Sequence, residues 1–266
     1  MRVISANVNG IRAAVRRGGI DWLAAAAPDV LCLQEVRATD AQLAKALTDS
    51  VFAGWHLVHA PSAAAGRAGV AVLSRLPHAR VQRELEHADF TDCGRWVEAD
   101  LRVGDRTLTV VSTYVHTGEA GTERQDEKLA FLEAVSDRMK QLEADEALAV
   151  VTGDLNVAHR RADLKNWKGN LGKSGFLPGE QAFLDRWLGS GWADVTRRAA
   201  GDVDGPYTWW SWRGKAFDND TGWRIDYQLA TEPLAALVTG SSVGRAETYA
   251  QRWSDHAAVV VDYAPA

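Results

Sequence analysis

The feature that most constrains the fold is an apolar run, Ala147 to Val151, followed at once by Thr152, Gly153, Asp154, Leu155 and Asn156. An apolar run bounded by glycine predicts a buried strand, which we expect to end at Gly153. If the chain stays extended there, Asp154 and Asn156 point to the same side and Leu155 points into the core. We therefore place this strand at the centre of the molecule.

Two interpretations of Asp154 and Asn156 are open from this stretch alone. A carboxylate and an amide that share one space can hold a water molecule or a metal ion against a substrate. The more ordinary alternative is an Asx turn that caps the following loop. The rest of the sequence has to decide between them.

The remaining apolar patterns predict strands that come in adjacent pairs, with helices between them. Strands are expected at Arg2 to Ala6, Val30 to Leu33, Trp55 to His59, Gly69 to Leu73, Arg95 to Val103, Arg106 to Tyr114, Tyr207 to Trp212, Trp223 to Ala230 and Ala257 to Tyr263. Helices are expected before Pro28, over Ala41 to Leu47, through Phe131, Val135, Met139 and Leu142 after a Thr122/Gln125 capping box, and from about Gly179 to Leu188. The predicted fold class is α/β, with two packed sheets covered by helices.

Length and composition favour one intracellular domain. The chain has 266 residues, 46% of them hydrophobic, and no linker-like segment, so we expect a single domain over residues 1–266. Cys32 and Cys93 cannot form a disulfide framework and are expected to be reduced. No apolar run approaches the roughly 18 residues of a membrane span, and the first residues contain no apolar signal core. A cytoplasmic protein without a membrane partner is expected.

The charge and the tryptophans are unevenly distributed. The net charge is −5, yet residues 1–20 contain Arg2, Arg12, Arg16 and Arg17 without an acid. The segment from His159 to Lys173 has five basic side chains against Asp163 alone. Eleven tryptophans are present, and several of them lie near Arg213 and Lys215. These features are compatible with solvated faces and core rings, or with a surface that grips a nucleic acid.

Polar residues recur at the ends of the predicted apolar strands. They are Asn7, Glu35, Tyr114, Asp154, Asn156, Asp226, Asp255 and His256. Each has an ordinary explanation, such as an Asp226 pair with Arg224, but together they indicate a site at the strand ends. Carboxylates and amides with one histidine suit Mg²⁺, whereas zinc prefers more nitrogen or sulfur ligands. His56 and His59 are interpreted as structural.

Two short motifs resemble other kinds of site and are set aside. Gly240 to Gly244 matches the serine-hydrolase elbow pattern, but the strand, turn and helix that the elbow requires are not predicted there. Gly172-Lys173-Ser174 resembles the end of a phosphate-binding loop, but Trp167 stands where its first glycine belongs.

Several segments resemble the exonuclease III family of apurinic/apyrimidinic (AP) endonucleases, within the DNase I-like superfamily. They are Asn7 to Ala13, Leu33 to Glu35, Gly153 to His159, Gly222 to Tyr227 and Ser254 to His256, and they cover nearly the whole chain in order. The short forms recur in inositol phosphatases and sphingomyelinases. The segment from Asp163 to Asn170, with Gly175-Phe176, is narrower and favours the DNA-repair branch. The resemblance implies a four-layer α-β-β-α sandwich.

The resemblance also implies roles for the residues at the strand ends. Tyr114, Asp154, Asn156, Asp226 and His256 form the expected catalytic set. Asp154 positions or deprotonates the attacking water, with Tyr114 and His256 as rival bases, and Asp226 orients His256. The expected metal set is Asn7, Glu35, Asp154, Asn156, Asp255 and His256, with Mg²⁺ as the ion and Mn²⁺ as a substitute.

DNA contacts are implied at a further group of residues. Trp209, Trp223 and Ile225 match positions that line a pocket for a flipped sugar without its base. Phosphate or duplex contacts are expected from Arg12, Arg37, Asn170 and Arg213. Two departures stand out: His116 replaces a proline common in relatives, and Val36-Arg37 replaces Thr-Lys.

The sequence thus predicts a monomeric, Mg²⁺-dependent DNA-repair phosphodiesterase. It is expected to cleave duplex DNA 5′ to abasic sites and to remove nucleotides or blocking groups from 3′ ends. The enzymatic alternative is a superfamily member that hydrolyses a phosphoinositide or phospholipid. The non-enzymatic alternative is a DNA-binding protein without catalysis, which predicts substituted site residues.

Overall fold

Two six-stranded sheets form the centre of the protein, and the computed structural model describes residues 1–143 and 147–265. The first sheet has the order β11 (Val238–Gly244), β12 (Ala258–Tyr263), β1 (Arg2–Asn7), β2 (Val30–Gln34), β4 (Val70–Ser74) and β3 (His56–Ala60). The second has the order β5 (His78–Gln82), β6 (Trp96–Val103), β7 (Arg106–Tyr114), β8 (Leu148–Asp154), β10 (Asp226–Thr231) and β9 (Trp192–Asp194). Both are mixed, because β1 pairs with β2 and β7 with β8 in parallel.

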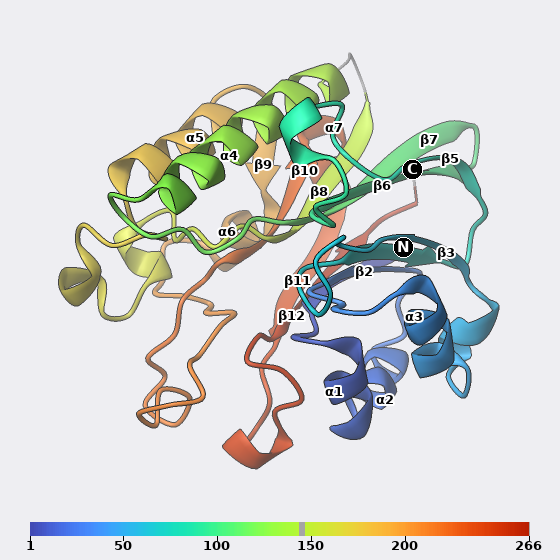
Figure 1. Ribbon diagram of the computed structural model, residues 1–266. Coiled ribbons are helices and arrows are strands. Elements are labelled where there is room, and N and C mark those ends of the chain that lie inside the picture. The colour runs from blue at the N-terminus through green and yellow to red at the C-terminus, as the bar shows by residue number, and fades with distance from the viewer. Residues whose placement is uncertain (144–146, 266) are drawn as a thin grey trace.

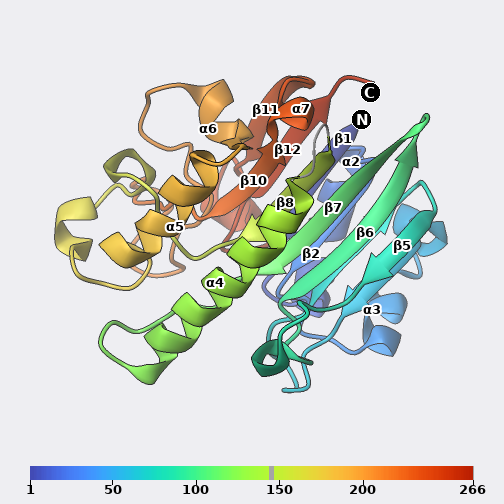
Figure 2. The ribbon, with the colours of Figure 1, turned by 90° about the horizontal axis from the view of Figure 1, so that it is seen from above.

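The sheets pack face to face and helices cover their outer faces (Figures 1 and 2). Helices α4 (Glu123–Leu142) and α5 (Pro178–Leu188) cover the second sheet, where Phe131 and Leu184 join a core with Val151. The first sheet is covered by α1 (Ile11–Arg16), α2 (Gly19–Ala25) and α3 (Asp40–Leu47), where Leu23 and Leu43 share a core. Short helices α6 (Val195–Ala200) and α7 (Glu232–Ala235) lie beside β10. The predicted four-layer α-β-β-α sandwich is confirmed.

Buried polar bonds fix the alignment of the two sheets. Gln34, at the end of β2, donates from Nε2 to the Ser112 hydroxyl of β7 over 2.9 Å. Gln228 of β10 donates to the carbonyl of Val3 in β1 over 3.0 Å. Because these groups are buried, breaking the bonds would leave polar atoms without partners. The sheets are therefore held in one register relative to each other.

Residues from the two ends of the sequence meet in the first sheet. Strand β1 lies between β2 and β12, so segments far apart in the chain are neighbours. The Met1 amino group donates to the Tyr263 carbonyl over 2.6 Å, and the Tyr263 amide donates to the Met1 carbonyl over 2.8 Å. Figures 1 and 2 show the two ends side by side.

Three strands were not predicted, and all of them are sheet edges. They are β5, β9 and β11. An edge strand has a solvated side and need not carry a continuous apolar pattern. Strand β11 contains Gly240 to Gly244, so the prediction that this segment is not a serine-hydrolase elbow is confirmed.

The prediction of a strand from Tyr207 to Trp212 is wrong, and the strand predicted from Trp223 begins only at Asp226. Within 207–212 the structure has only isolated bridges, through Trp209 to Trp223 and to His256. The alternating aromatics arise because Trp210 packs into a small separate core while Trp209 lies in the candidate site. The alternating sequence pattern therefore reflects where these two tryptophan side chains pack, and not a β-strand.

Two helix predictions also need correction. The segment before Pro28 forms two short helices separated at Gly18, whose φ is +77°, and the second ends at Ala25. The Thr122 capping box is absent, because the Thr122 hydroxyl donates to the Glu119 carbonyl and the Gln125 amide donates to buried Glu180. No helix among the described residues is long and apolar enough to cross a membrane.

Candidate active site

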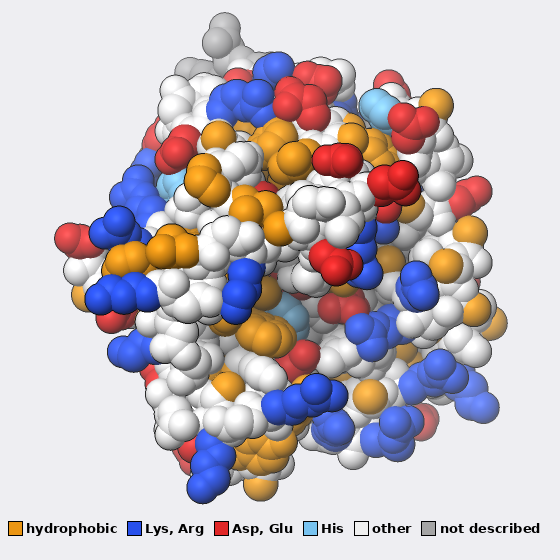
Figure 3. Space-filling view, turned by 60° about the vertical axis from the view of Figure 1, so that its left-hand side comes forward, with side chains coloured by type: hydrophobic (Ala, Val, Ile, Leu, Met, Phe, Trp, Pro, Cys, Tyr) orange, Lys and Arg blue, Asp and Glu red, His pale blue; other side chains and the backbone are white. Residues whose placement is uncertain are grey.

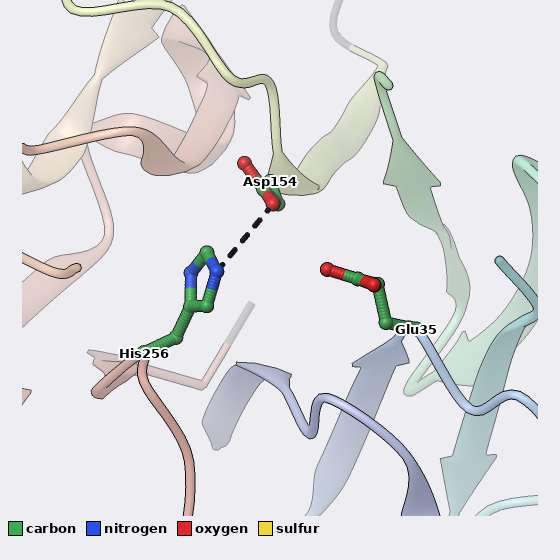
Figure 4. A group of neighbouring side chains, drawn as sticks. All are labelled: Glu35, Asp154 and His256. Atoms are coloured by element: carbon green, nitrogen blue, oxygen red, sulfur yellow. Dashed lines mark ion pairs between the residues drawn. The ribbon is translucent and has the colours of Figure 1, made fainter. Parts of the chain in front are cut away.

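Polar residues from both sheets meet at one edge of the sandwich. Parallel strands β1 and β2 end at Asn7 and next to Glu35, while parallel strands β7 and β8 end at Tyr114 and Asp154. The antiparallel strands β10 and β12 begin at this edge, so they add Asp226 and, just ahead of β12, His256. Figure 4 shows Glu35, Asp154 and His256 pointing toward one another. The predicted convergence of strand-end residues is found.

Asp154 accepts hydrogen bonds on both of its carboxylate oxygens and is only 1% exposed. Its Oδ2 accepts from the Asn7 amide over 2.9 Å and from the Asn156 amide over 3.1 Å. Its Oδ1 accepts from the Asn156 backbone N–H over 2.8 Å, which is an Asx turn. Asn156 has a φ of +50°, so the extended chain predicted beyond Gly153 is wrong. The turn and the site interpretation hold together, because the turn brings the amide back onto Asp154.

Glu35 is held by two neighbours and has an unusual backbone. Its Oε1 accepts from the Asn7 amide over 2.8 Å, and its Oε2 accepts from Arg37. Asn7 therefore bridges Glu35 and Asp154 as a hydrogen-bond donor. Glu35, Arg37, Asn9 and Asn156 all have φ between +44° and +50°, a region that is costly for side-chain-bearing residues. Such strain is concentrated at this edge of the sandwich.

His256 is oriented by Asp226 and faces Asp154. Its Nδ1 lies 2.9 Å from Asp226 Oδ2, which also accepts from the Thr208 hydroxyl over 2.6 Å. Its Nε2 lies 3.7 Å from Asp154 Oδ2. The alternative pairing of Asp226 with Arg224 is wrong, because buried Arg224 pairs with Asp163 and Asp194 instead.

Burial and charge shift the pKa values of the central groups. Burial opposes the charged form of His256, but Asp226 and Asp154 outweigh it and raise the pKa of His256 to about 10. Burial, followed by Asp226 and Glu35 against the opposing His256, raises the pKa of Asp154. Burial together with Glu35 and Asp154 raises the pKa of Tyr114. The site therefore favours a cationic imidazole and a protonated phenol, and it disfavours the ionised form of the Asp154 carboxylate.

One group of potential metal ligands is found among the described residues. It consists of Glu35, Asp154 and His256, whose ligand atoms all lie within 4.8 Å of one another. Asp255 lies beside this group, where its carboxylate accepts from Asn9 over 2.6 Å and from the Trp209 indole over 3.2 Å. The arrangement can hold a cation through carboxylate oxygens.

The aromatic residues of the predicted pocket lie next to His256. Backbone bridges join Trp209 to both Trp223 and His256. The Trp209 and Trp223 rings meet edge to face with their centroids 6.4 Å apart, and both are partly exposed. Ile225 is 5% exposed, so it contributes more to the wall than to the surface.

Of the predicted phosphate contacts, Arg37 pairs with Glu35 in the site, whereas the others lie around it. Arg12 lines a groove with Arg37, and Asn170 lines another in the loop that carries Lys168. Arg213 is exposed in the loop after Trp212. Figure 3 shows a hollow with acidic, histidine and hydrophobic side chains inside it and Lys and Arg side chains around it.

Sequence reasoning missed the residues that hold the site residues in place. Thr208 accepts from the backbone N–H of Asp226 and donates to its carboxylate, and Ser254 donates to the Asn7 carbonyl over 2.8 Å. Asn9, which lies in the segment Asn7 to Ala13 without an assigned role, donates to Asp255. Ser254 belongs to the segment Ser254 to His256, although no role was assigned to it, whereas the sequence around Thr208 gives no signal of its role.

Comparisons with known proteins agree with this geometry. Residues 4–256 match the model of the Endonuclease/Exonuclease/phosphatase family. The chain is 31% identical over 244 residues to an exodeoxyribonuclease of Bacillus subtilis (strain 168), covering 91% of this chain and 93% of that protein.

Two solved structures share the fold. An AP endonuclease from Archaeoglobus fulgidus superimposes with a TM-score of 0.84 at 27% identity, over 99% of both chains. The 3′ phosphatase NExo from Neisseria, bound to a product DNA hairpin, gives a TM-score of 0.86 at 27% identity, over 99% of both chains. The family resemblance predicted from the strand-end motifs is confirmed. The chain belongs to the endonuclease/exonuclease/phosphatase family.

Proposed function

We propose that this protein is a metal-dependent DNA-repair nuclease that cuts duplex DNA 5′ to abasic sites and removes nucleotides and blocking groups from 3′ ends. The observation that carries the proposal is the meeting of Glu35, Asp154 and the Asp226-oriented His256 at one buried point. The names of the relatives, an exodeoxyribonuclease, an AP endonuclease and a 3′ phosphatase, support this choice of substrate.

The donor set fits Mg²⁺, with Mn²⁺ as a substitute. Glu35 and Asp154 would hold the ion through carboxylate oxygens, which hard cations prefer. Burial and the neighbouring carboxylates raise the pKa of Asp154, so a cation beside it relieves the repulsion. When bound, Mg²⁺ supplies Lewis-acid polarisation of the phosphate and neutralises developing charge.

Asp154 is the group we assign to the attacking water. A raised pKa keeps the Tyr114 phenol protonated, and a pKa of about 10 keeps His256 cationic at neutral pH. The pKa of Asp154 is also raised, but a cation beside this carboxylate would favour its ionised form, so we assign Asp154 as the proton acceptor. Its Oδ2 is fixed by Asn7 and Asn156, so the position of a water bound there is also fixed.

His256 and Tyr114 are the donors we assign to the phosphate. The Nε2–H of His256 is free of Asp226, which binds the opposite nitrogen. A donor held in place before reaction stabilises the charge that develops on phosphate oxygens without reorganising. In-line attack then leaves a 3′ hydroxyl and a 5′ phosphate.

The aromatic wall supplies the preference for abasic sites in this proposal. An apolar surface is formed by Trp209, Trp223 and Ile225. It lies next to His256, because a backbone bridge joins Trp209 to His256. A sugar without its base fits such a surface, whereas an intact base has to be unpaired at a cost of about a few kcal/mol.

The test uses a labelled duplex with one stable abasic analogue, incubated with Mg²⁺ or with a chelator. We expect one Mg²⁺-dependent cut immediately 5′ of the analogue and slower shortening from 3′ ends. The isosteric variant Asp154→Asn should lose about 10²–10⁴-fold in kcat, because it removes the proton acceptor. An exposed control variant, Asp137→Asn, should cleave normally.

Either of two results contradicts the proposal. Full activity of a folded Asp154→Asn protein removes the assigned mechanism. Absence of any DNA cleavage by the wild type, together with hydrolysis of a phosphoinositide or phospholipid, moves the protein to another branch of the family.

A further inference from the structure

A second pocket opens directly beside the candidate active site. It has a volume of about 510 Å³ and shares Glu35 and Tyr114 with the site. Its basic lining consists of Arg37, Arg67, Arg95 and Arg124, and we call it the arginine pocket. These arginines come from four separate segments of the chain, so the fold, and not a local charge run, collects them.

Two of the four arginines are already paired with acids. Arg37 binds Glu35, and Arg95 binds Glu127 over 2.8 Å. The Arg124 Nε donates to the Thr117 carbonyl, a neutral partner, over 2.8 Å. Among the described residues, neither Arg67 nor Arg124 forms an ion pair. The lining acids are Glu35 and Asp92, so the pocket is positive in a chain whose net charge is −5.

His116 lies among the positive charges of this pocket. It lines the pocket, and its Nε2 lies 3.1 Å from the Arg124 carbonyl. Burial and then the Arg95 charge lower the pKa of His116 to about 4. The imidazole is therefore neutral at physiological pH, and the charge of the pocket comes from its guanidinium groups.

Arg95 and Arg124 are anchored next to the site. The Arg95 carbonyl accepts from the Tyr114 backbone N–H over 2.9 Å, so Arg95 and Tyr114 are fixed to each other. Arg124 lies in the first turn of α4. A groove lined by Arg12 and Arg16 continues from the pocket and shares Arg37 with it. The basic surface is thus a strip that begins at the catalytic edge.

We propose that the arginine pocket binds a backbone phosphate of the nucleic-acid strand that flanks the scissile bond on the Tyr114 side. Guanidinium groups suit phosphate because their planar N–H groups can donate in pairs. The pocket adjoins the assigned reacting groups, so a strand held at His256 and Trp209 continues past Tyr114. This inference rests on the proposed nuclease function and adds a binding subsite to it.

The test compares Arg67→Ala, Arg124→Ala and the double variant with the control Arg102→Ala. Arg102 is exposed on β6, which begins beside the site at Trp96 and runs away from it. We expect KM for duplex DNA to rise several-fold in each pocket variant and more in the double, with kcat within about twofold. The slope of log KM against log salt should flatten by about one unit per lost phosphate contact. A pocket variant that matches Arg102→Ala in both KM and the salt slope overturns the inference.

A second arm identifies the source of the phosphate. Substrates are shortened one nucleotide at a time on either side of the scissile bond. The rise in KM caused by Arg67→Ala and Arg124→Ala should vanish when the nucleotides on one side of the scissile bond are removed. It should persist when those on the other side are removed. A penalty independent of both flanks, with inhibition of the wild type by inorganic phosphate that the double variant escapes, assigns the pocket to free phosphate and overturns the inference. Wild-type cleavage of the full duplex is the internal check on the nuclease function itself.

Discussion

His256 lies between two carboxylates that act on it in different ways. Asp226 binds its Nδ1 and fixes the ring, while Asp154 faces its Nε2 from 3.7 Å. Both raise the pKa of His256 against the effect of burial. The side chain can thus remain a cationic donor in a buried position, which an isolated histidine would not.

This balance predicts the titration of a single variant. Asp226→Asn keeps the shape of the side chain but removes its charge, so the pKa of His256 should fall from about 10 toward its ordinary value. The measurement is an NMR titration of the imidazole signals in chelator. An unchanged pKa in the variant would contradict the role assigned to Asp226. Asp89→Asn, at an exposed position in the 3-10 helix Ala88–Phe90, serves as a control.

The sign of the linked stability effect follows from the raised pKa. A folded-state pKa of about 10 lies above the unfolded value of about 6.5, so the folded protein binds this proton more tightly. The contribution of His256 to folding is therefore complete below about pH 6.5 and is lost as the pH rises through about 10.

The residues that meet at the strand ends could be predicted, whereas those that support them could not. Glu35 and Asp154 follow buried apolar runs, which identify strand ends without knowledge of the fold. Thr208 supports Asp226 from an irregular segment with no periodic pattern. Its role depends on contacts 18 residues apart in the chain, which periodicity does not report.

At the level of elements, a buried ion pair joins α4 and α5 to the site. Lys128 Nζ lies 2.6 Å from Glu180 Oε1 and donates to the Asn156 carbonyl over 2.8 Å. Both side chains are fully buried. Glu180 Oε2 also accepts from the backbone of Gly175 and Leu177, which closes the basic loop after His159. The pair thus fixes Asn156 and the end of that loop together.

Removing one member of this pair should be strongly destabilising. Glu180→Gln leaves the Lys128 charge buried without its partner, at a cost of about 3–5 kcal/mol. The double variant Lys128→Met/Glu180→Gln should lose less than the sum of the single variants, because no unpaired charge remains. Urea denaturation measures all three, with the exposed pair variant Arg198→Met as a control for a surface ion pair. Additive losses would contradict the coupling.

Central elements of the fold could be predicted from the sequence and edge elements could not. Strands β2 and β8 are buried throughout, so their apolar runs are unbroken. Strand β5 is largely exposed and β9 has only three residues, so neither has a distinctive pattern. The strand predicted around Trp209 is wrong for the opposite reason. Aromatic side chains alternate there, but the backbone forms no continuous hydrogen-bond ladder.

At the scale of the whole molecule, the two sheets use the sequence differently. The second sheet is built from one continuous stretch, from β5 to β10. The first combines β1 to β4 with β11 and β12, which come from the opposite end of the sequence. The site takes Glu35 and His256 from the first sheet side and Asp154 from the second, so it exists only when both sheets are assembled.

This dependence predicts that folding and the site are lost together. Since each sheet buries one face against the other, we propose a single domain that unfolds in one cooperative transition. Calorimetry and tryptophan fluorescence should give coincident midpoints, and activity measured after brief heating should fall at the same temperature. Two separated transitions would show that one sheet is stable alone.

The backbone bonds between Met1 and Tyr263 give the chain almost the connectivity of a closed ring. A short glycine-rich connection across that junction would leave every strand neighbour unchanged. New ends could then be opened in the β6–β7 hairpin at Gly104, on an exposed turn at the far end of the second sheet from the site. In such a circular permutant, the order of the strands along the sequence changes. The spatial arrangement that brings Glu35, Asp154 and His256 together stays the same.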